Sequence, residues 1–148
     1  MVWGCFGVEG VDELFFLPPG EKINGTLYHT VLDCCALKSM ENLHCNTFQQ
    51  NGAPCHRVAK VRKLFEDAGK NVLAWPGNSA DLNPIENLWD TLKLAVGRKQ
   101  SQNFGHLCEC IRLAWHVHLT PEYCSRLVRS MPQRIQAVIE ARGASTKY

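Results

Sequence analysis

FQQNGAPCH occupies residues 48–56 of this chain, and WPGNSADLNPIENLW occupies residues 75–89. The first stretch is typical of a strand that runs into a polar turn, and the second of a loop that leads into a capped helix. Asn51 lies in the turn and Glu86 near the start of the helix, so residues 52–85 separate them, 34 in all. One helix, one strand and a loop fit in that interval, which lets two polar side chains converge from separate elements. Metal-dependent nucleases bring distant acidic groups together by such an arrangement, but one of the two groups here is an amide.

Length and composition place the chain among ordinary globular domains. It has 148 residues, of which 45% are hydrophobic and 20% charged, which is enough to bury one sizeable core. We therefore expect one domain. The net charge of +2 and the pI near 8.1 permit nucleic-acid binding without predicting it, since a strongly basic face is the usual footprint. No run of about 18 apolar residues occurs, so no membrane span is expected.

The eight cysteines predict free thiols rather than disulfides or a zinc site. Residues 1–10 lack the basic segment and apolar run of a signal peptide, so an oxidising compartment is not indicated. Cys108 and Cys110 are separated by one residue, as are His116 and His118, and neither pair has the spacing of structural zinc ligands. Free and mostly buried thiols are the favoured interpretation. The other six cysteines are Cys5, Cys34, Cys35, Cys45, Cys55 and Cys124.

Periodicity and capping signals predict strands and helices in a mixed order. Residues 2–6 and 11–17 are rich in strand formers around a glycine-containing turn, which predicts a hairpin. Asn24 is a cap candidate for an amphipathic helix to residue 40, and Asn83 followed by Pro84 is a strong helix start. The remaining elements are expected as strands at 43–49 and 72–75 and as helices at 57–69, 103–117, 121–130 and 132–141. This order predicts an α/β fold with a mixed sheet covered by helices.

Several groups of residues resemble one known family. They are VWGCF at 2–6, the FQQ, AP and His56 pattern within 48–56, the WP and DLNPIENLW segments within 75–89, and a tail with PEYC at 121–124 and TKY at 146–148. In order and spacing, these motifs resemble the catalytic domain of Tc/mariner-superfamily DDE transposases, specifically the C-terminal part of a Tc-like transposase. The resemblance covers essentially the whole chain.

The resemblance implies an RNase H-like fold, with a mixed sheet flanked by helices and a helical C-terminal tail. Residues 1–148 would form the DDE-transposase catalytic domain, with the sheet and core helices in 1–97 and the helical tail in 98–148. The family's first strand would lie upstream of Met1, so the sheet is expected to lack it. The implied activity is cut-and-paste DNA transposition and DNA integration in the nucleus. The implied cofactor is Mg²⁺ or Mn²⁺, and the implied partners are DNA at transposon ends and a second copy of the chain.

Only one of the family's three acidic metal ligands is expected in this sequence. Glu86 matches the third ligand, and the interval of 34 residues is that of its DDE subgroup. Asn51 falls at the position of the second catalytic aspartate, and the first would precede Met1. An amide offers one neutral oxygen where a carboxylate offers charge and bridging capacity. We therefore expect a transposase-derived domain that is catalytically inactive. The alternative is a non-catalytic DNA-binding or dimerisation module that regulates a related transposase.

Other candidate residues have both a functional and a structural interpretation. His56, Arg57 and Lys60 are predicted DNA contacts, although His56 can instead orient its loop and the basic residues can lie on a solvated helix face. Glu86 can also complement the helix dipole, and Asp81 is expected to cap the turn before that helix. Core packing is favoured for Trp75, Trp89 and Trp115, and a solvated position for Arg126, Arg129 and Arg134.

Overall fold

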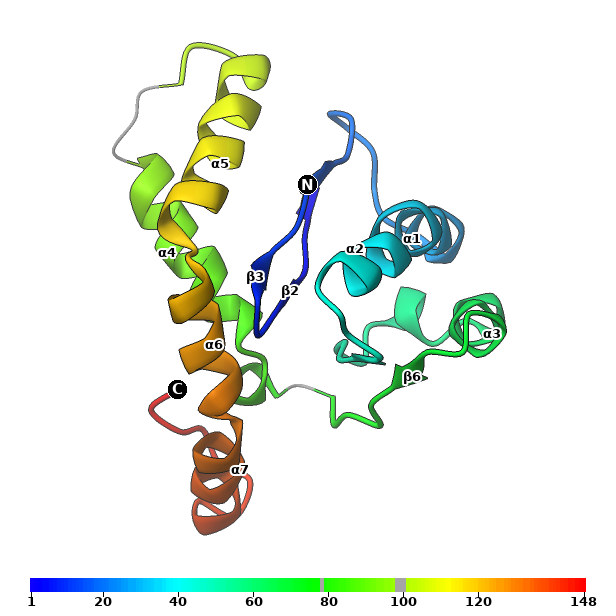
Figure 1. Cartoon of the computed structure of the whole chain (residues 1–148), viewed down its shortest axis with the longest axis vertical. Helices are drawn as coiled ribbons and strands as arrows, with labels where there is room; N and C mark the ends of the chain where they lie inside the picture. The colour runs from blue at the N-terminus through cyan, green and yellow to red at the C-terminus, as the bar shows by residue number, and fades with distance from the viewer. Residues whose placement is uncertain (78, 98–100) are drawn as a thin grey trace. The chain divides into compact units, whose positions relative to one another are not determined.

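The computed structural model describes residues 1–77, 79–97 and 101–148 (Figure 1). The contacts among these residues fall into two groups, which we call unit 1 and unit 2. Unit 1 consists of Met1–Cys5 and Asp12–Ser79, and unit 2 of Phe6–Val11 and Ala80–Tyr148. The polar turn around Asn51 therefore belongs to unit 1, and Glu86 to unit 2.

The N-terminal hairpin forms as two short antiparallel ladders. In unit 1, β1 (Val2–Trp3) pairs with β4 (Phe15–Phe16), and in unit 2, β2 (Phe6–Gly7) pairs with β3 (Gly10–Val11). The prediction of a hairpin is confirmed, but each strand is only two residues long. Gly10, the first residue of β3, has a φ of 131°, a conformation that favours glycine.

A parallel pair of strands is the third ladder among the described residues. β5 (Thr47–Phe48) lies beside β6 (Asn71–Val72), and α3 (Ala59–Asp67) forms the crossover between them. The predicted strand at 43–49 is too long at its start, because His44 at a φ of 50° still belongs to the end of the preceding helix. Both strand orientations are therefore present, but the described strands pair two by two rather than as one mixed sheet.

The first predicted helix is present and contains a widened turn. It consists of α1 (Gly25–Val31), a π-helical turn η1 (Leu32–Ala36) and α2 (Leu37–Asn42). As predicted, Asn24 caps it: the Asn24 Oδ1 accepts from the N–H groups of Thr26 and Leu27, both at 2.9 Å.

The core of unit 1 explains the widened turn. Tyr28, Leu32, Ala36 and Met40 are all buried and repeat every four residues. An α-helix has about 3.6 residues per turn, so a strict repeat of four would drift around its surface. A π-helical turn holds more residues and keeps the four side chains on one face. That face packs against α3 through two buried side chains, Val61 and Phe65.

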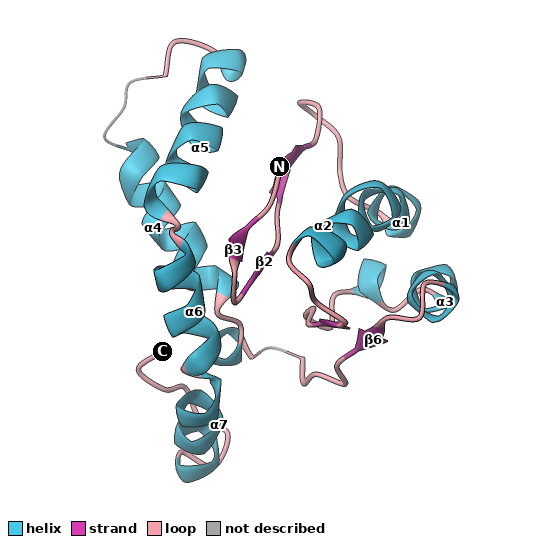
Figure 2. Cartoon of the chain, in the orientation of Figure 1, coloured by secondary structure: helices cyan, strands magenta, loops and turns pink. Residues whose placement is uncertain are grey.

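Unit 2 is built mainly from four helices, shown in cyan in Figure 2. They match the predicted ranges within a few residues, and polar caps explain their starts. Asn103 accepts from the N–H of His106 at 2.9 Å, and Thr120 accepts from the N–H of Tyr123 at 3.3 Å. The helices are α4 (Ile85–Gly97), α5 (Phe104–His118), α6 (Pro121–Arg129) and α7 (Met131–Glu140), with a short turn η3 (Ala80–Leu82) before them.

Two tryptophans lie at the contact of α4 and α5. Trp115 is fully buried, and its ring stacks on that of Trp89 with the centroids 5.1 Å apart. Core packing is therefore confirmed for Trp115, whereas Trp89 and Trp75 are both half-buried. Because α4 packs on α5, the structure groups it with the helices that follow, and the division of the chain at residue 97 stays a prediction.

The cysteines are free thiols with very different exposure. Only Cys108, Cys110 and Cys124 are buried, and Cys34 lies exposed on η1, so the prediction that the thiols are mostly buried is wrong. Burial raises the pKa of the Cys5 and Cys124 thiols to about 11, which keeps both protonated at neutral pH. In the described ranges, no helix is both long and apolar enough to cross a bilayer.

Candidate functional site

Asn51 closes the polar turn that follows β5. Its Oδ1 accepts a hydrogen bond from the N–H of Ala53 at 3.1 Å, and the short helical turn η2 (Pro54–His56) begins directly afterwards. Proline suits the first position of such a turn because it has no N–H to leave unpaired. With the oxygen used in this way, the Nδ2 amino group of Asn51 is left as a donor. Within the described residues of unit 1, nothing accepts from it.

His56 holds the turn from the other end. Its Nδ1 lies 2.9 Å from the carbonyl oxygen of Asn51, and its ring stacks on Tyr28 with the centroids 4.1 Å apart. The hydroxyl of Tyr28 donates to Gln50 Oε1 at 2.7 Å. Burial lowers the pKa of His56, although the bond to Asn51 acts in the opposite direction. A neutral His56 therefore donates through Nδ1 and orients the loop, as one of its two interpretations predicts.

The side chain of Arg57 is hydrogen-bonded to the backbone of the same turn. Its Nε donates to the carbonyl oxygen of Gly52 at 2.7 Å. A Cβ at Gly52 would come within 2.8 Å of the Arg57 Nη2, and a Cβ at Gly77 within 3.9 Å of it. The guanidinium can occupy this place only because residue 52 has no side chain. No carboxylate in the described part of unit 1 pairs with it.

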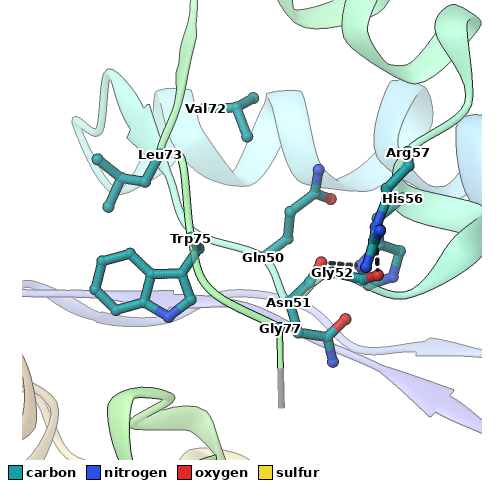
Figure 3. A pocket seen from close by; sticks show the side chains of 9 residues that line it. All are labelled: Gln50, Asn51, Gly52, His56, Arg57, Val72, Leu73, Trp75 and Gly77. Atoms are coloured by element: carbon teal, nitrogen blue, oxygen red, sulfur yellow. Dashed lines mark hydrogen bonds between the residues drawn. The ribbon is translucent and has the colours of Figure 1, made fainter. Parts of the chain in front are cut away.

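These side chains line one side of a pocket of about 400 Å³ in unit 1. Figure 3 shows the polar groups along the turn and the apolar side chains along the end of β6 and the segment that follows it. Two of the apolar residues, Val72 and Leu73, are 38% and 41% exposed, which is high for side chains of this kind. The lining residues are Gln50, Asn51, Gly52, His56, Arg57, Val72, Leu73, Trp75 and Gly77.

Glu86 lies in the first turn of α4, as predicted. Its N–H donates to the carbonyl oxygen of Asn83 at 3.1 Å, and the Asn83 amide donates back to Glu86 Oε1 at 3.2 Å. This reciprocal pairing satisfies groups that a helix start would otherwise leave unpaired. The carboxylate is exposed. The role of Glu86 as a metal ligand stays a prediction, as does that of exposed Lys60 on α3 as a DNA contact.

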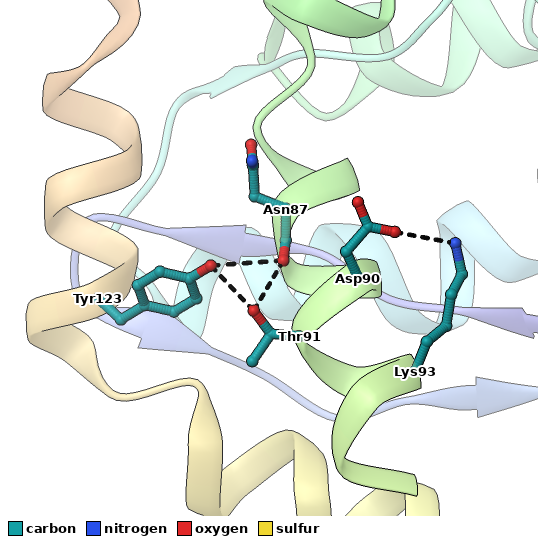
Figure 4. A network of polar contacts seen from close by, with 5 residues as sticks. All are labelled: Asn87, Asp90, Thr91, Lys93 and Tyr123. Carbon is teal, nitrogen blue, oxygen red and sulfur yellow. Dashed lines mark hydrogen bonds and ion pairs between the residues drawn. The ribbon is translucent and has the colours of Figure 1, made fainter. Parts of the chain in front are cut away.

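Asn87, the next residue of the same motif, connects three helices of unit 2. Its carbonyl oxygen accepts from Thr91 at 2.9 Å and from the Tyr123 hydroxyl at 3.4 Å, and the two hydroxyls lie 3.0 Å apart (Figure 4). Its side-chain Oδ1 accepts from Arg134 Nη2 at 2.8 Å. Asn87 thus has a structural role, since its hydrogen bonds connect α6 and α7 to α4.

Arg134 and Asp81 hold the C-terminal residues of unit 2. Arg134 is only 3% exposed, and its guanidinium carbon lies 4.8 Å from the centre of the Tyr148 ring. The prediction of a solvated Arg134 is therefore wrong. Asp81 does not cap its own turn, which the backbone of Asn83 closes; its carboxylate accepts from the N–H of Thr146. The bonds from Thr146, and the nearby charge of Arg134, lower the pKa of Asp81.

Comparison with known proteins gives a consistent result. Residues 41–108 match the family model of the DDE superfamily endonuclease. The chain is 32% identical over 156 residues to the Tc1 transposase of Caenorhabditis elegans, an alignment that covers all of this chain and 54% of that protein. Along its whole length, the chain is similar to transposases of the Tc/mariner superfamily. It spans about half the length of the curated transposases it matches.

Solved transposase structures share the fold. The catalytic domain of Mos1 mariner transposase matches with a TM-score of 0.83 and 19% identity, over 99% of this chain and 75% of that one. The Mos1 mariner paired end complex with Mn matches with a TM-score of 0.88 and 19% identity, over 99% of this chain and 44% of that one. The match confirms the predicted RNase H-like fold, and the expected lack of its first strand stays a prediction.

The pocket of unit 1 does not fit a divalent cation. Mg²⁺ and Mn²⁺ prefer several oxygen ligands, of which some are carboxylates. Among the nine lining residues there is no carboxylate, and Arg57 contributes a positive charge. The Oδ1 of Asn51, the residue predicted to stand at the position of the second catalytic aspartate, is already bonded to Ala53. The turn therefore presents hydrogen-bond donors where a metal site needs acceptors.

The lowered pKa of His56 predicts a loss of stability in mild acid. The unfolded chain takes up a proton at this residue below about pH 6.5, whereas the folded chain resists it to a lower pH. Stability is therefore fully present above that pH and falls as the pH is lowered through it. Urea unfolding at about pH 7.5 and pH 5.5 measures the effect. His56→Gln should remove part of the difference, and an unchanged pH dependence in that variant would contradict the assignment.

Proposed function

We propose that this chain is a Tc/mariner transposase domain that binds DNA and does not cut it. The observation that carries the proposal is the polar turn of unit 1, where Asn51 stands at the position of the second catalytic aspartate and commits its oxygen to Ala53. The loss of a partner that only orients a metal ligand reduces metal affinity or activity by about 10–100-fold, and replacement of a ligand itself should reduce it further. Arg57 and the lack of a carboxylate around the pocket support the same conclusion.

The family suggests the partners. We infer that the domain contacts DNA at transposon ends, that a second copy of the chain pairs with it, and that it acts in the nucleus. The similarity to the Tc1 transposase and to the Mos1 paired end complex supports this inference. Arg57 and Lys60 are the proposed phosphate contacts from unit 1, and both side chains are exposed. Sequence-independent contacts of this kind weaken steeply as salt is added.

Metal binding and strand cleavage test the proposal together. The unchanged chain should shift duplex DNA in EDTA at about 50 mM salt, lose most of that binding at about 200 mM, and produce no nicks when Mn²⁺ is added. Asn51→Asp restores one carboxylate and should raise the affinity for Mn²⁺, measured by calorimetry, at least about tenfold. Nicking by the unchanged chain that depends on Mn²⁺ would contradict the proposal.

A matched control distinguishes the effect of a carboxylate at position 51 from the effect of an added negative charge anywhere on unit 1. Asn71 is exposed at the start of β6 and does not line the pocket. Asn71→Asp adds the same negative charge to unit 1, and it should change the affinity for Mn²⁺ by less than about twofold, since exposed charges are screened. Equal gains in the two variants would show that any added carboxylate attracts the ion.

A further inference from the structure

The pocket of unit 1 has a donor side with a net positive charge. The turn directs the Asn51 oxygen to the backbone, so the amide presents its NH₂ group. The side-chain oxygen of Gln50 is likewise occupied, because its Oε1 accepts from the Tyr28 hydroxyl, so its amino group is available as a donor. Arg57 adds a permanent cation. Groups of this kind bind the oxygens of an anion, and they repel a metal ion.

Arg57 is already positioned for such a ligand. Its Nε is bonded to the carbonyl oxygen of Gly52 at 2.7 Å, which fixes the plane of the guanidinium. Neither Nη atom has a partner among the described residues of unit 1. Two parallel N–H groups on a fixed plane match two oxygens of a phosphate, and less side-chain entropy is lost when the geometry exists beforehand.

The opposite side of the pocket is apolar and open. Val72 ends β6, Leu73 and Trp75 lie in the segment that follows it, and Val72 and Leu73 are well exposed (Figure 3). Two exposed aliphatic side chains and a half-buried tryptophan, in the same pocket as an arginine, suit the flat face of a base, which stacks on side chains without regard to sequence. The volume of about 400 Å³ is in the range of small-ligand pockets.

We propose that this pocket binds one nucleotide of a DNA strand directly, without a divalent metal, with the phosphate at Arg57 and Asn51 and the base against Leu73 and Trp75. The proposal rests on the proposed function, since it names the ligand and the binding mode of the same turn. The replacement of aspartate by Asn51 then converts a position for cation binding into one for anion binding.

Calorimetry with deoxyadenosine monophosphate in EDTA tests the proposal. The nucleotide should bind, and addition of Mg²⁺ in place of EDTA should leave its affinity unchanged within about twofold. Deoxyadenosine, which has no phosphate, and inorganic phosphate, which has no base, should each bind at least about tenfold more weakly, since each lacks one set of contacts. A short single-stranded oligonucleotide should displace the mononucleotide, which identifies a DNA strand as a source of the phosphate. Affinity that requires Mg²⁺, or equal affinity for deoxyadenosine, would overturn the proposal.

Variants of the turn locate the binding. Arg57→Gln and Asn51→Asp should each weaken nucleotide binding at least about tenfold. Gly52→Ala places a Cβ 2.8 Å from the Arg57 Nη2, so it should displace the guanidinium and weaken binding several-fold. The control is Arg62→Gln, an exposed arginine of α3 that does not line the pocket, which should change affinity by less than about twofold. Urea unfolding confirms that each variant is folded. If Arg57→Gln and Arg62→Gln have equal effects, the proposal is wrong.

The two proposals fail in distinguishable ways. If duplex DNA is not bound but the mononucleotide is bound and depends on Arg57, the proposed function fails and the pocket assignment stands. If duplex DNA is bound in EDTA but the mononucleotide is not, the assignment of the pocket fails and the DNA-binding function stands.

Discussion

Arg134→Met is expected to lower the free energy of unfolding by about 2–4 kcal/mol. Methionine keeps much of the buried aliphatic stem but removes every donor. Arg134 Nη1 donates to the carbonyl oxygen of Asp81 at 3.0 Å, and Nη2 donates to Asn87 Oδ1 at 2.8 Å. Each acceptor left without a partner in the interior costs about 1–3 kcal/mol. The Nε bond to Ser130 Oγ at 2.8 Å and the contact with the Tyr148 ring are lost as well.

The control is another arginine of the same helical tail. Arg129 on α6 is exposed, and its Nε donates to Ser125 Oγ at 3.1 Å. Arg129→Met should change the free energy of unfolding by less than about 0.5 kcal/mol, because water replaces the lost partner. Urea unfolding followed by tryptophan fluorescence measures both variants. Equal losses in the two would show that the buried bonds of Arg134 contribute nothing beyond a surface arginine.

Trp115→Ala is expected to destabilise the chain by about 3–5 kcal/mol, the range for removal of a large buried aromatic side chain. Trp115 is fully buried on α5, and its ring stacks on Trp89 of α4. The substitution removes apolar contact area and the aromatic pair together, and it leaves a cavity between the two helices.

Leu113 provides the matched control for Trp115. It lies two residues earlier on α5 and is 56% exposed. Leu113→Ala removes an apolar side chain from the same helix without opening a cavity, and it should change stability by less than about 0.5 kcal/mol. The difference between the two unfolding midpoints isolates burial. A similar loss in both would mean that α5 is destabilised by any truncation.

The helices could be predicted from the sequence because their signals are local. Asn24, Asn103 and Thr120 cap helices that begin where the sequence places them, and each cap bonds to a residue two or three positions ahead. The strands were predicted too long because pairing depends on partners elsewhere in the chain. Of the predicted strand at 43–49, only Thr47 and Phe48 find a partner strand in β6.

In the candidate site too, features set by nearby residues could be predicted from the sequence, and features set by distant residues could not. The places of Asn51 in a turn and of Glu86 at a helix start follow from nearby residues, and both are confirmed. The position of Arg57 beside Gly52 depends on how the backbone of the turn is folded, and no pattern of residue types in the sequence predicts it. The burial of Arg134 depends on Asp81 and Asn87, which lie 53 and 47 residues away in the chain. Partners at such distances are visible only once the chain is folded.

The widened turn η1 marks the place where the first helix tolerates a change of chain length. Asp33 and Cys34 are exposed within this turn, so neither side chain fills the core. Deletion of either one would return the segment to a regular α-helix, in which residues three or four apart share a face. Tyr28, Leu32, Ala36 and Met40 would then be spaced four, three and four residues apart, and Met40 would keep its place in the core beside Phe65. A lost codon should therefore be less harmful in this turn than in the regular helical turns on either side.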